Sequence, residues 1–232
     1  MPHALGSLMI ALVMLSMAHP VIGQETKPAK FRLHSLDGLQ VMNIKAEVAE
    51  YRGRRAVRLV KRDDQKGAVA PDIESIAIVK GSDFKDGTIE AEIAGKPGEG
   101  APEDARGFVG IAFRVSEKGD KFECFYLRPT NSRADDQLRR NHSTQYVSAP
   151  DYPWFRLRKE NFGVYESYVD LEAGAWTKIK IVVSGTKARL YINGAAEPCL
   201  IVNDLKLGES RGQIALWTTV ETDAYFSNLT VK

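Results

Sequence analysis

The sequence predicts an all-β fold, a two-sheet antiparallel jelly-roll sandwich with a long loop-rich insert at about residues 128–165. Short segments in which apolar and polar residues alternate follow one another to the C-terminus. Turn signals such as Asp86-Gly87 and Asn193-Gly194 separate these segments. Many short strands at such spacing are typical of a sandwich or a barrel. Beyond the N-terminal leader, no segment of ten or more residues shows a helical period, which argues against a helical domain.

The first 23 residues are expected to be a signal peptide that is removed from the mature protein. An apolar run spans Leu5–Ala18, the helix-breaking pair His19-Pro20 follows it, and small residues then precede an expected cleavage site before Gln24. A membrane anchor is the alternative, but the run has 14 residues and a membrane-spanning helix needs about 20. We therefore predict an exported protein, periplasmic or extracellular, without stable membrane insertion after cleavage.

Residues 24–232 are expected to form one domain, because their number suffices to bury a substantial core. The 32 basic and 30 acidic residues leave a net charge of +2, which indicates neither a nucleic-acid nor a lipid partner. Cys124 and Cys199 are expected either to form one disulfide or to remain buried thiols. With His34 and His142 as the histidines of the mature chain, the sequence argues against a zinc enzyme.

The alternation also assigns a face to each side chain of an expected strand. In Gly107–Val115, the odd-numbered residues from 109 onward are large and apolar and are expected to face the core. The even-numbered residues end in Arg114 and suit a concave surface, on which either a ligand or a loop of the protein itself lies. Trp217 is expected on the same surface, because Ile214 and Leu216 take the inward phase. The expected strands are Val41–Val48, Ala56–Val60, Ile73–Val79, Gly87–Ala94, Gly107–Val115, Phe122–Arg128, Tyr165–Leu171, Trp176–Val183, Ala188–Ile192, Gln213–Thr219 and Ala224–Val231.

The segments at residues 176–194, 200–208 and 212–231 share a pattern of closing strands. They contain a strand that begins with Trp and Lys (WTKIKIVV), a hairpin closed by Asn-Gly, and a last strand after GQIALW. This half of the chain resembles the concanavalin A-like lectin/glucanase superfamily, and within it the laminin G-like branch. GSDFKDGTIEAEIAG resembles the strand before the concave sheet of these proteins. The resemblance implies a concanavalin A-like jelly roll over most of residues 82–232.

The glucanases of this superfamily use a Glu-x-Asp-x-Glu strand, and this motif is absent from the sequence. Glu166 and Asp170 would lie about 13 Å apart along a strand, too far for a pair of glycosidase carboxylates. Glu90 and Glu92 would lie about 6.7 Å apart, within the inverting range, but are expected on a solvated outer face. The chain is also similar to the 3-keto-disaccharide hydrolase domain, although RGFVGIAFRV replaces the Gly-x-Asn-Ser-Gly-Ile pattern of that domain. Hydrolysis by the glucanase mechanism is therefore not expected.

The segment Arg128–Asp170 differs from the rest of the chain in its density of arginines, carboxylates and aromatic rings. Loops rich in forked donors and flat rings carry function more often than strands do. Sugars in particular are bound by rings that lie against their C–H faces and by planar polar groups that bridge hydroxyls. The alternative is that this network only ties the insert to the sheet. The predicted glycan-binding residues are Arg128, Asn131, Asp135, Gln137, Arg140, Tyr152 and Trp154 of the insert, together with Arg114 and Trp217 of the sheet.

A polysaccharide lyase or a 3-keto-glycoside hydrolase that uses the same insert is the enzymatic alternative. β-Elimination on an acidic sugar requires an acid–base pair and a cation that neutralises the carboxylate. His142, Tyr146 and Arg139 are the candidate catalytic residues for this chemistry. In the competing interpretation, His142 caps a turn and Tyr146 packs under the loop.

The cofactor and the partner each have a further alternative. No cofactor is expected, but oxygen ligands from Asp135, Asp136 and Asp151 are the candidates for a calcium site, although their spacing matches no standard loop. A carbohydrate is the expected partner. A protein partner is the alternative, because many laminin G-like domains are interaction modules.

Overall fold

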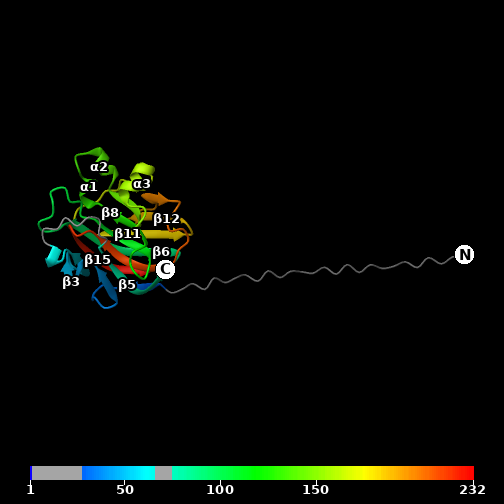
Figure 1. The fold of residues 1–232 in the computed structure, drawn as a ribbon, viewed down its shortest axis with the longest axis horizontal. Coiled ribbons are helices and arrows are strands. Elements are labelled where there is room, and N and C mark those ends of the chain that lie inside the picture. The colour runs from blue at the N-terminus through cyan, green and yellow to red at the C-terminus, as the bar shows by residue number, and fades with distance from the viewer. Residues whose placement is uncertain (2–27, 66–74) are drawn as a thin grey trace.

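The computed structural model describes residues 1, 28–65 and 75–232 (Figure 1). Apart from Met1, the predicted signal peptide at residues 1–23 lies outside the described residues, as does the start of the predicted strand Ile73–Val79. The described chain folds into a β-sandwich with three short helices gathered at one side of it (Figure 1). None of the described helices is long and apolar enough to cross a membrane.

The first sheet consists of eight strands with antiparallel pairing. They are β1 (Ala29–Phe31), β3 (Lys45–Tyr51), β4 (Arg54–Val60), β6 (Gly87–Pro97), β11 (Thr177–Ser184), β12 (Lys187–Ile192), β13 (Leu200–Val202) and β15 (Thr222–Val231). Their order across the sheet is β13-β12-β11-β6-β15-β4-β3, and β1 pairs with β15.

The second sheet consists of seven strands, also antiparallel. They are β2 (Leu39–Met42), β5 (Ser75–Phe84), β7 (Val109–Val115), β8 (Phe122–Leu127), β9 (Thr144–Ala149), β10 (Glu166–Ser167) and β14 (Gly212–Thr218). Their order is β10-β9-β8-β7-β14-β5-β2. The helices are α1 (Pro129–Ser132), α2 (Gln137–Asn141) and α3 (Trp154–Glu160), and a 3-10 turn spans Asp63–Gln65. The predicted fold class, a two-sheet antiparallel sandwich, is confirmed.

The prediction of one continuous strand at Val41–Val48 is wrong, because two strands occupy this segment. Asn43 has a positive φ of 58° and separates β2 from β3, which enter different sheets. Asparagine tolerates this left-handed conformation better than most residues, so the chain can cross from one layer to the other here.

The predicted loop-rich insert is more regular than the sequence indicates. It contains β9, which lies between β8 and β10 and is buried at every position. Burial on both faces removes the alternation of apolar and polar residues that identifies a half-exposed strand. The predicted strand Tyr165–Leu171, in contrast, is reduced to the two residues of β10.

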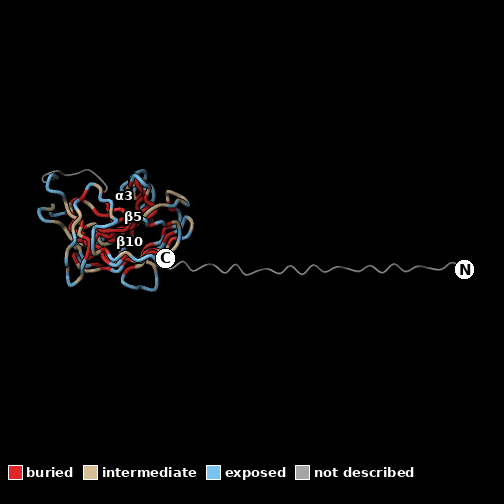
Figure 2. Tube along the Cα trace, turned by 90° about the horizontal axis from the view of Figure 1, so that it is seen from below, coloured by how far each residue is buried: buried red, intermediate tan, exposed pale blue. Residues whose placement is uncertain are grey.

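A row of aromatic rings crosses the second sheet in the core. Figure 2 shows the buried stretches of the backbone in red. Neighbouring ring centroids lie 6.1, 6.2, 5.6 and 5.6 Å apart, and each ring belongs to a residue that is at most 3% exposed. Such contacts stabilise a core by about 0.5–1.5 kcal/mol each beyond the burial of their area. In order, the residues are Phe84, Phe113, Phe125, Tyr146 and Tyr165.

Candidate functional site

The position of Val109 distinguishes the two faces of the second sheet. A Cβ atom at Gly95 of β6 would come within 2.7 Å of Val109 Cγ1, so Val109 faces the first sheet. Gly110 therefore lies on the opposite, outer face. The strand register places Trp217 and Tyr126 beside Gly110 on this outer face, which is where the alternation predicts Trp217.

Four aromatic residues form an apolar surface on the outer face. The ring of Tyr126 stacks on Trp217 with centroids 4.6 Å apart, and the ring of Phe108 lies 5.4 Å from that of Tyr126. Glycine at position 110 permits this packing, because a Cβ atom there would come within 2.5 Å of Tyr126 Cβ. With Trp154 of α3, these rings line a small cavity of about 90 Å³. We call Phe108, Tyr126, Trp154 and Trp217 the aromatic platform.

Short-range hydrogen bonds join α1 and α2 of the insert, whose helices lie at one side of the sandwich (Figure 1). Asp136 caps α2, because its Oδ1 accepts a hydrogen bond from the backbone N–H of Arg139 at 2.7 Å. Asn131 of α1 donates its Nδ2 to His142 O at 3.1 Å and accepts from Arg139 Nε at 3.0 Å. These bonds fix the positions of Arg139 and His142 relative to each other.

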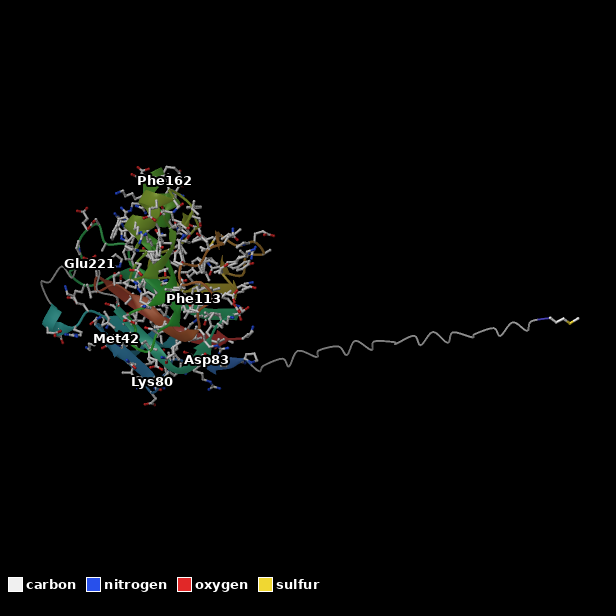
Figure 3. All side chains as sticks on the ribbon, turned by 45° about the vertical axis from the view of Figure 1, so that its right-hand side comes forward. Met42, Lys80, Asp83, Phe113, Phe162 and Glu221 are labelled. Atoms are coloured by element: carbon white, nitrogen blue, oxygen red, sulfur yellow. The ribbon has the colours of Figure 1, made fainter. Side chains whose placement is uncertain are left out.

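A cleft of about 600 Å³ adjoins the aromatic platform and shares Phe108 and Trp154 with it. Phe162 and Glu221 both line the cleft, and Figure 3 shows Phe162 at the top of the insert and Glu221 below it. We call this space the arginine cleft, after four lining residues, Arg106, Arg128, Arg139 and Arg158.

Arg128 joins the platform to the cleft and is 4% exposed. Its Nη2 donates to Tyr126 OH and to Gln145 Oε1, both at 3.0 Å. Its Nη1 donates to His142 O at 3.2 Å. The guanidinium carbon lies 5.2 Å from the ring centroid of Tyr126 and 5.9 Å from that of Trp154, within the range of cation–π attraction. These contacts fix its orientation.

Glu166 supplies the buried negative charge beside these arginines. Arg158 donates its Nε to Glu166 Oε1 at 2.9 Å and its Nη2 to Oε2 at 2.6 Å, a paired geometry that is strong and directional. Arg128 Nη1 lies 3.6 Å from the same Oε2. His142 Nδ1 lies 2.8 Å from it. One carboxylate therefore serves two arginines and a histidine.

Burial lowers the pKa of His142 below its ordinary value of 6.5. The negative charge of Glu166 raises this pKa, and the positive charges of Arg158 and Arg128 lower it further. The imidazole is therefore neutral at pH 7. A neutral ring that donates Nδ1–H to the Glu166 carboxylate keeps Nε2 as a hydrogen-bond acceptor. This arrangement can orient a hydroxyl or accept a proton.

The structure brings together part of the predicted site and disperses the rest. Arg128, Asn131, Arg139, His142 and Trp154 line the arginine cleft, and Trp217 lies in the adjoining platform. Asp135 and Gln137 are exposed and do not line it, and Arg140 turns to the hydroxyl of Tyr168 at 3.3 Å. Tyr152 packs instead against Arg156. Short helices direct neighbouring side chains to different sides, so density in sequence does not produce convergence in space.

Arg114 does not contribute to the cleft, contrary to the sequence prediction. Its positive φ of 54° interrupts the alternation of β7, from which the prediction was made. Its buried guanidinium donates to the carbonyl oxygens of Lys85, Gly185 and Gly208. Arg114 therefore ties three turns together.

Tyr146 also does not line the cleft, and the structure does not bring it together with His142 there. The side chain is buried in the core, on the inner face of the second sheet. Its hydroxyl donates to Glu123 Oε2 at 2.5 Å and accepts from the backbone N–H of Lys206 at 2.9 Å. Burial raises the pKa of both Tyr146 and Glu123. The interpretation in which Tyr146 packs beneath a loop agrees with this position.

Replacing Tyr146 with phenylalanine is expected to lower the free energy of unfolding by about 1–3 kcal/mol, because Glu123 and the Lys206 N–H lose a buried partner. Urea denaturation measures the change. Tyr168→Phe is the matched control, since Tyr168 is 43% exposed and its loss of a hydroxyl should change stability little. If Tyr146 acted in the cleft, the substitution would reduce the free energy of glycan binding by more than it reduces the free energy of unfolding.

The carboxylates of the two candidate pairs have different surroundings. Glu90 and Glu92 lie on the solvated face of the first sheet as expected, where Lys232 and Asn228 bind them. Asp170 is exposed and pairs with an arginine of the insert, whereas Glu166 is buried in the site.

The structure also places the residues of the calcium and disulfide alternatives. Asp136 caps a helix and Asp151 is exposed, and within residues 28–65 and 75–232 no group of three or more His, Cys, Asp or Glu is arranged to hold a metal. Cys124 and Cys199 both remain thiols, and burial raises the pKa of the Cys199 thiol to about 11.

Several site residues could not be identified as such from the sequence. Arg106 ends a Gly/Pro/Glu-rich segment that predicts only a surface loop, and nothing local shows that this loop faces the insert. Arg158 and Glu166 form a pair that only the folded insert assembles. Tyr126 had a usable signal, because it stands two residues before Arg128 and therefore shares its face of the strand.

The fold is similar to those of several solved proteins. The carbohydrate-binding module CBM66 from Bacillus subtilis matches with a TM-score of 0.55 and 14% identity, over 84% of this chain and 96% of that one. A Bacillus subtilis protein of unknown function with a galectin-like fold matches with a TM-score of 0.56 and 11% identity, over 88% of this chain and 94% of that one. A proposed glycosyl hydrolase from Parabacteroides distasonis matches with a TM-score of 0.54 and 10% identity, over 88% of this chain and 98% of that one.

No family model matches the sequence, and no curated protein matches it. The laminin G-like branch remains a prediction. The two antiparallel sheets, their strand order and the likeness to galectin-like sandwiches together show that this chain has the concanavalin A-like lectin/glucanase fold.

Proposed function

We propose that this chain is an exported carbohydrate-binding domain whose glycan lies across the aromatic platform and the arginine cleft. The observation that carries the proposal is the position of Trp154, which is 39% exposed and borders both spaces. An exposed indole beside forked donors suits a sugar, whose C–H face packs on a ring while its hydroxyls bind planar polar groups. The fold shared with the module CBM66 and the apolar leader support binding and export, respectively.

Replacing Trp154 with alanine is expected to weaken glycan binding at least about tenfold, because a central tryptophan anchor commonly accounts for about 2 kcal/mol or more. The mature chain is first screened on an array of neutral and acidic glycans. The best-bound glycan is then titrated calorimetrically into the wild-type protein and the variant.

Tyr168→Ala is the matched control for this substitution. Tyr168 is 43% exposed, close to the value for Trp154, and does not line the cleft. Binding by this variant should equal that of the wild type. The proposal fails if the wild-type protein binds no glycan on the array, or if the two aromatic substitutions weaken binding equally.

A glycoside-active enzyme of the lyase type is the second candidate, and the contact of His142 with Glu166 favours it. A neutral imidazole held by a carboxylate can remove the proton from the sugar carbon beside the carboxylate, and the arginines can stabilise the charge that develops. A C=C bond then forms as the C–O bond to the next sugar breaks, and the leaving oxygen takes a proton from water. Ultraviolet absorbance of unsaturated sugars after incubation with acidic polysaccharides tests for this activity. If the wild-type protein forms unsaturated product and His142→Ala does not, the enzyme is favoured. If the wild-type protein binds the polysaccharide but forms no product, the carbohydrate-binding domain is favoured.

A further inference from the structure

Two of the four arginines in the cleft have no carboxylate partner among the described residues. Arg139 donates its Nε to Asn131 Oδ1 at 3.0 Å and its Nη2 to Thr130 Oγ1 at 3.2 Å, and both acceptors are uncharged. Arg106 Nη1 is buried and has no hydrogen-bond partner within the same part of the chain. Buried polar groups are nearly always bonded, and this donor is one of four exceptions among the side chains of the described residues.

The other two arginines already have a buried counter-charge. Arg158 forms a two-bond pair with Glu166, and Arg128 lies 3.6 Å from the same carboxylate. The positive charge that is available to a ligand is therefore concentrated on Arg106 and Arg139.

The acidic residues that line the cleft do not neutralise this pair. Asp136 Oδ1 is engaged as the cap of α2. Asp104 is exposed and Glu221 is half-buried, and neither forms an ion pair with a described arginine. Exposed carboxylates act weakly at a distance, because water and salt screen them. Asp104 attracts Arg106 without forming an ion pair, and the pKa of Arg106 still lies below its usual range.

We infer that the glycan is acidic, and that Arg106 and Arg139 bind its carboxylate or sulfate group. The inference rests on the proposed function, because it names the class of glycan that the same site takes. Guanidinium groups bind oxyanions through paired N–H donors, a geometry that carboxylates and sulfates share. Burial and the nearby charge of Arg139 hold the pKa of Arg106 below its usual range, and the exposed carboxylate of Asp104 offsets only part of this effect. An oxyanion bound beside Arg106 and Arg139 removes this repulsion.

The test uses an array in which each sugar backbone appears in a neutral, a uronate and a sulfated form. The wild-type mature chain is expected to bind at least one acidic form about tenfold or more tightly than its neutral counterpart, as for a charged hydrogen bond of typical strength. Arg106→Gln and Arg139→Gln are each expected to remove this preference. The uronate and sulfate arms identify which group is bound, and a preference in either arm supports the inference.

Arg133→Gln is the matched control, because Arg133 belongs to the same insert, has a side chain that is 56% exposed, and pairs with Asp170 outside the cleft. This variant should keep the preference. Arg106→Gln should also keep or raise the temperature of unfolding, since the Arg106 side chain forms no hydrogen bond with a described residue. A clear fall in that temperature would assign Arg106 a structural role and overturn the inference.

The remaining outcomes separate the inference from the proposed function. Equal binding of neutral and acidic forms, lost in Trp154→Ala, would overturn the acidic ligand and leave the carbohydrate-binding domain. Absence of binding to every glycan on the array would overturn both.

Discussion

Replacing Glu166 with glutamine is expected to lower the free energy of unfolding by about 3–5 kcal/mol, the range observed when one partner of a buried ion pair is removed. The side chains of Glu166 and Arg128 are 4% and 5% exposed, so water cannot compensate the arginine after the change. Arg158 and His142 lose a charged partner at the same time. Urea denaturation measures the loss. Glycan binding should weaken in the same variant, because these residues shape the arginine cleft.

Glu160→Gln is the control for this prediction. Glu160 pairs with Arg156 on α3, but the two side chains are 44% and 41% exposed. Surface pairs of this kind contribute little, so stability should change by less than about 0.5 kcal/mol. Similar effects of the two substitutions would show that Glu166 does not hold a buried charge network.

Replacing Phe125 with alanine is expected to lower the free energy of unfolding by about 3–5 kcal/mol through lost burial and the cavity that remains. Phe125 is fully buried and contacts both Phe113 and Tyr146 in the aromatic row of the core. For a domain of this size the midpoint should fall by roughly 2–4 °C per kcal/mol. Differential scanning calorimetry measures this shift.

Phe155→Ala provides the comparison, because Phe155 is 52% exposed on α3. Its removal should change stability by no more than about 0.5 kcal/mol. If Phe125→Ala were equally mild, the aromatic row would not be part of a closely packed core.

Stability and the proposed ligand binding depend on some of the same residues in this candidate site. Arg128 and Glu166 hold the insert on the sheet and also shape the cleft. Arg106, in contrast, forms no side-chain hydrogen bond with a described residue. A substitution there therefore reports on the ligand with little change in folding, which makes it the more direct test of function.

The alternation of side chains was sufficient to predict most strands and the outward position of Trp217. It failed where the chain leaves regular geometry, at the positive φ of Arg114, and where both faces of a strand are covered, at β9. The inward position of Tyr146 escapes prediction for the second reason. Because the insert covers the outer face of β9, neither face of this strand is exposed to water. The sequence of β9 therefore lacks the exposed polar face that would identify the opposite face as the inner one.

By itself, the sequence determined the all-β class, the strand periods, and an insert rich in arginines and aromatic rings as the place of the candidate site, because these are local properties of the chain. Only the tertiary structure decided which of those side chains meet. Arg106 comes from a loop before β7, Arg128 from the end of β8, and Arg158 from α3, and their common cleft depends on long-range packing. The partners of a guanidinium group are set by the segments that lie across from it in space, and the chain's local pattern does not encode them.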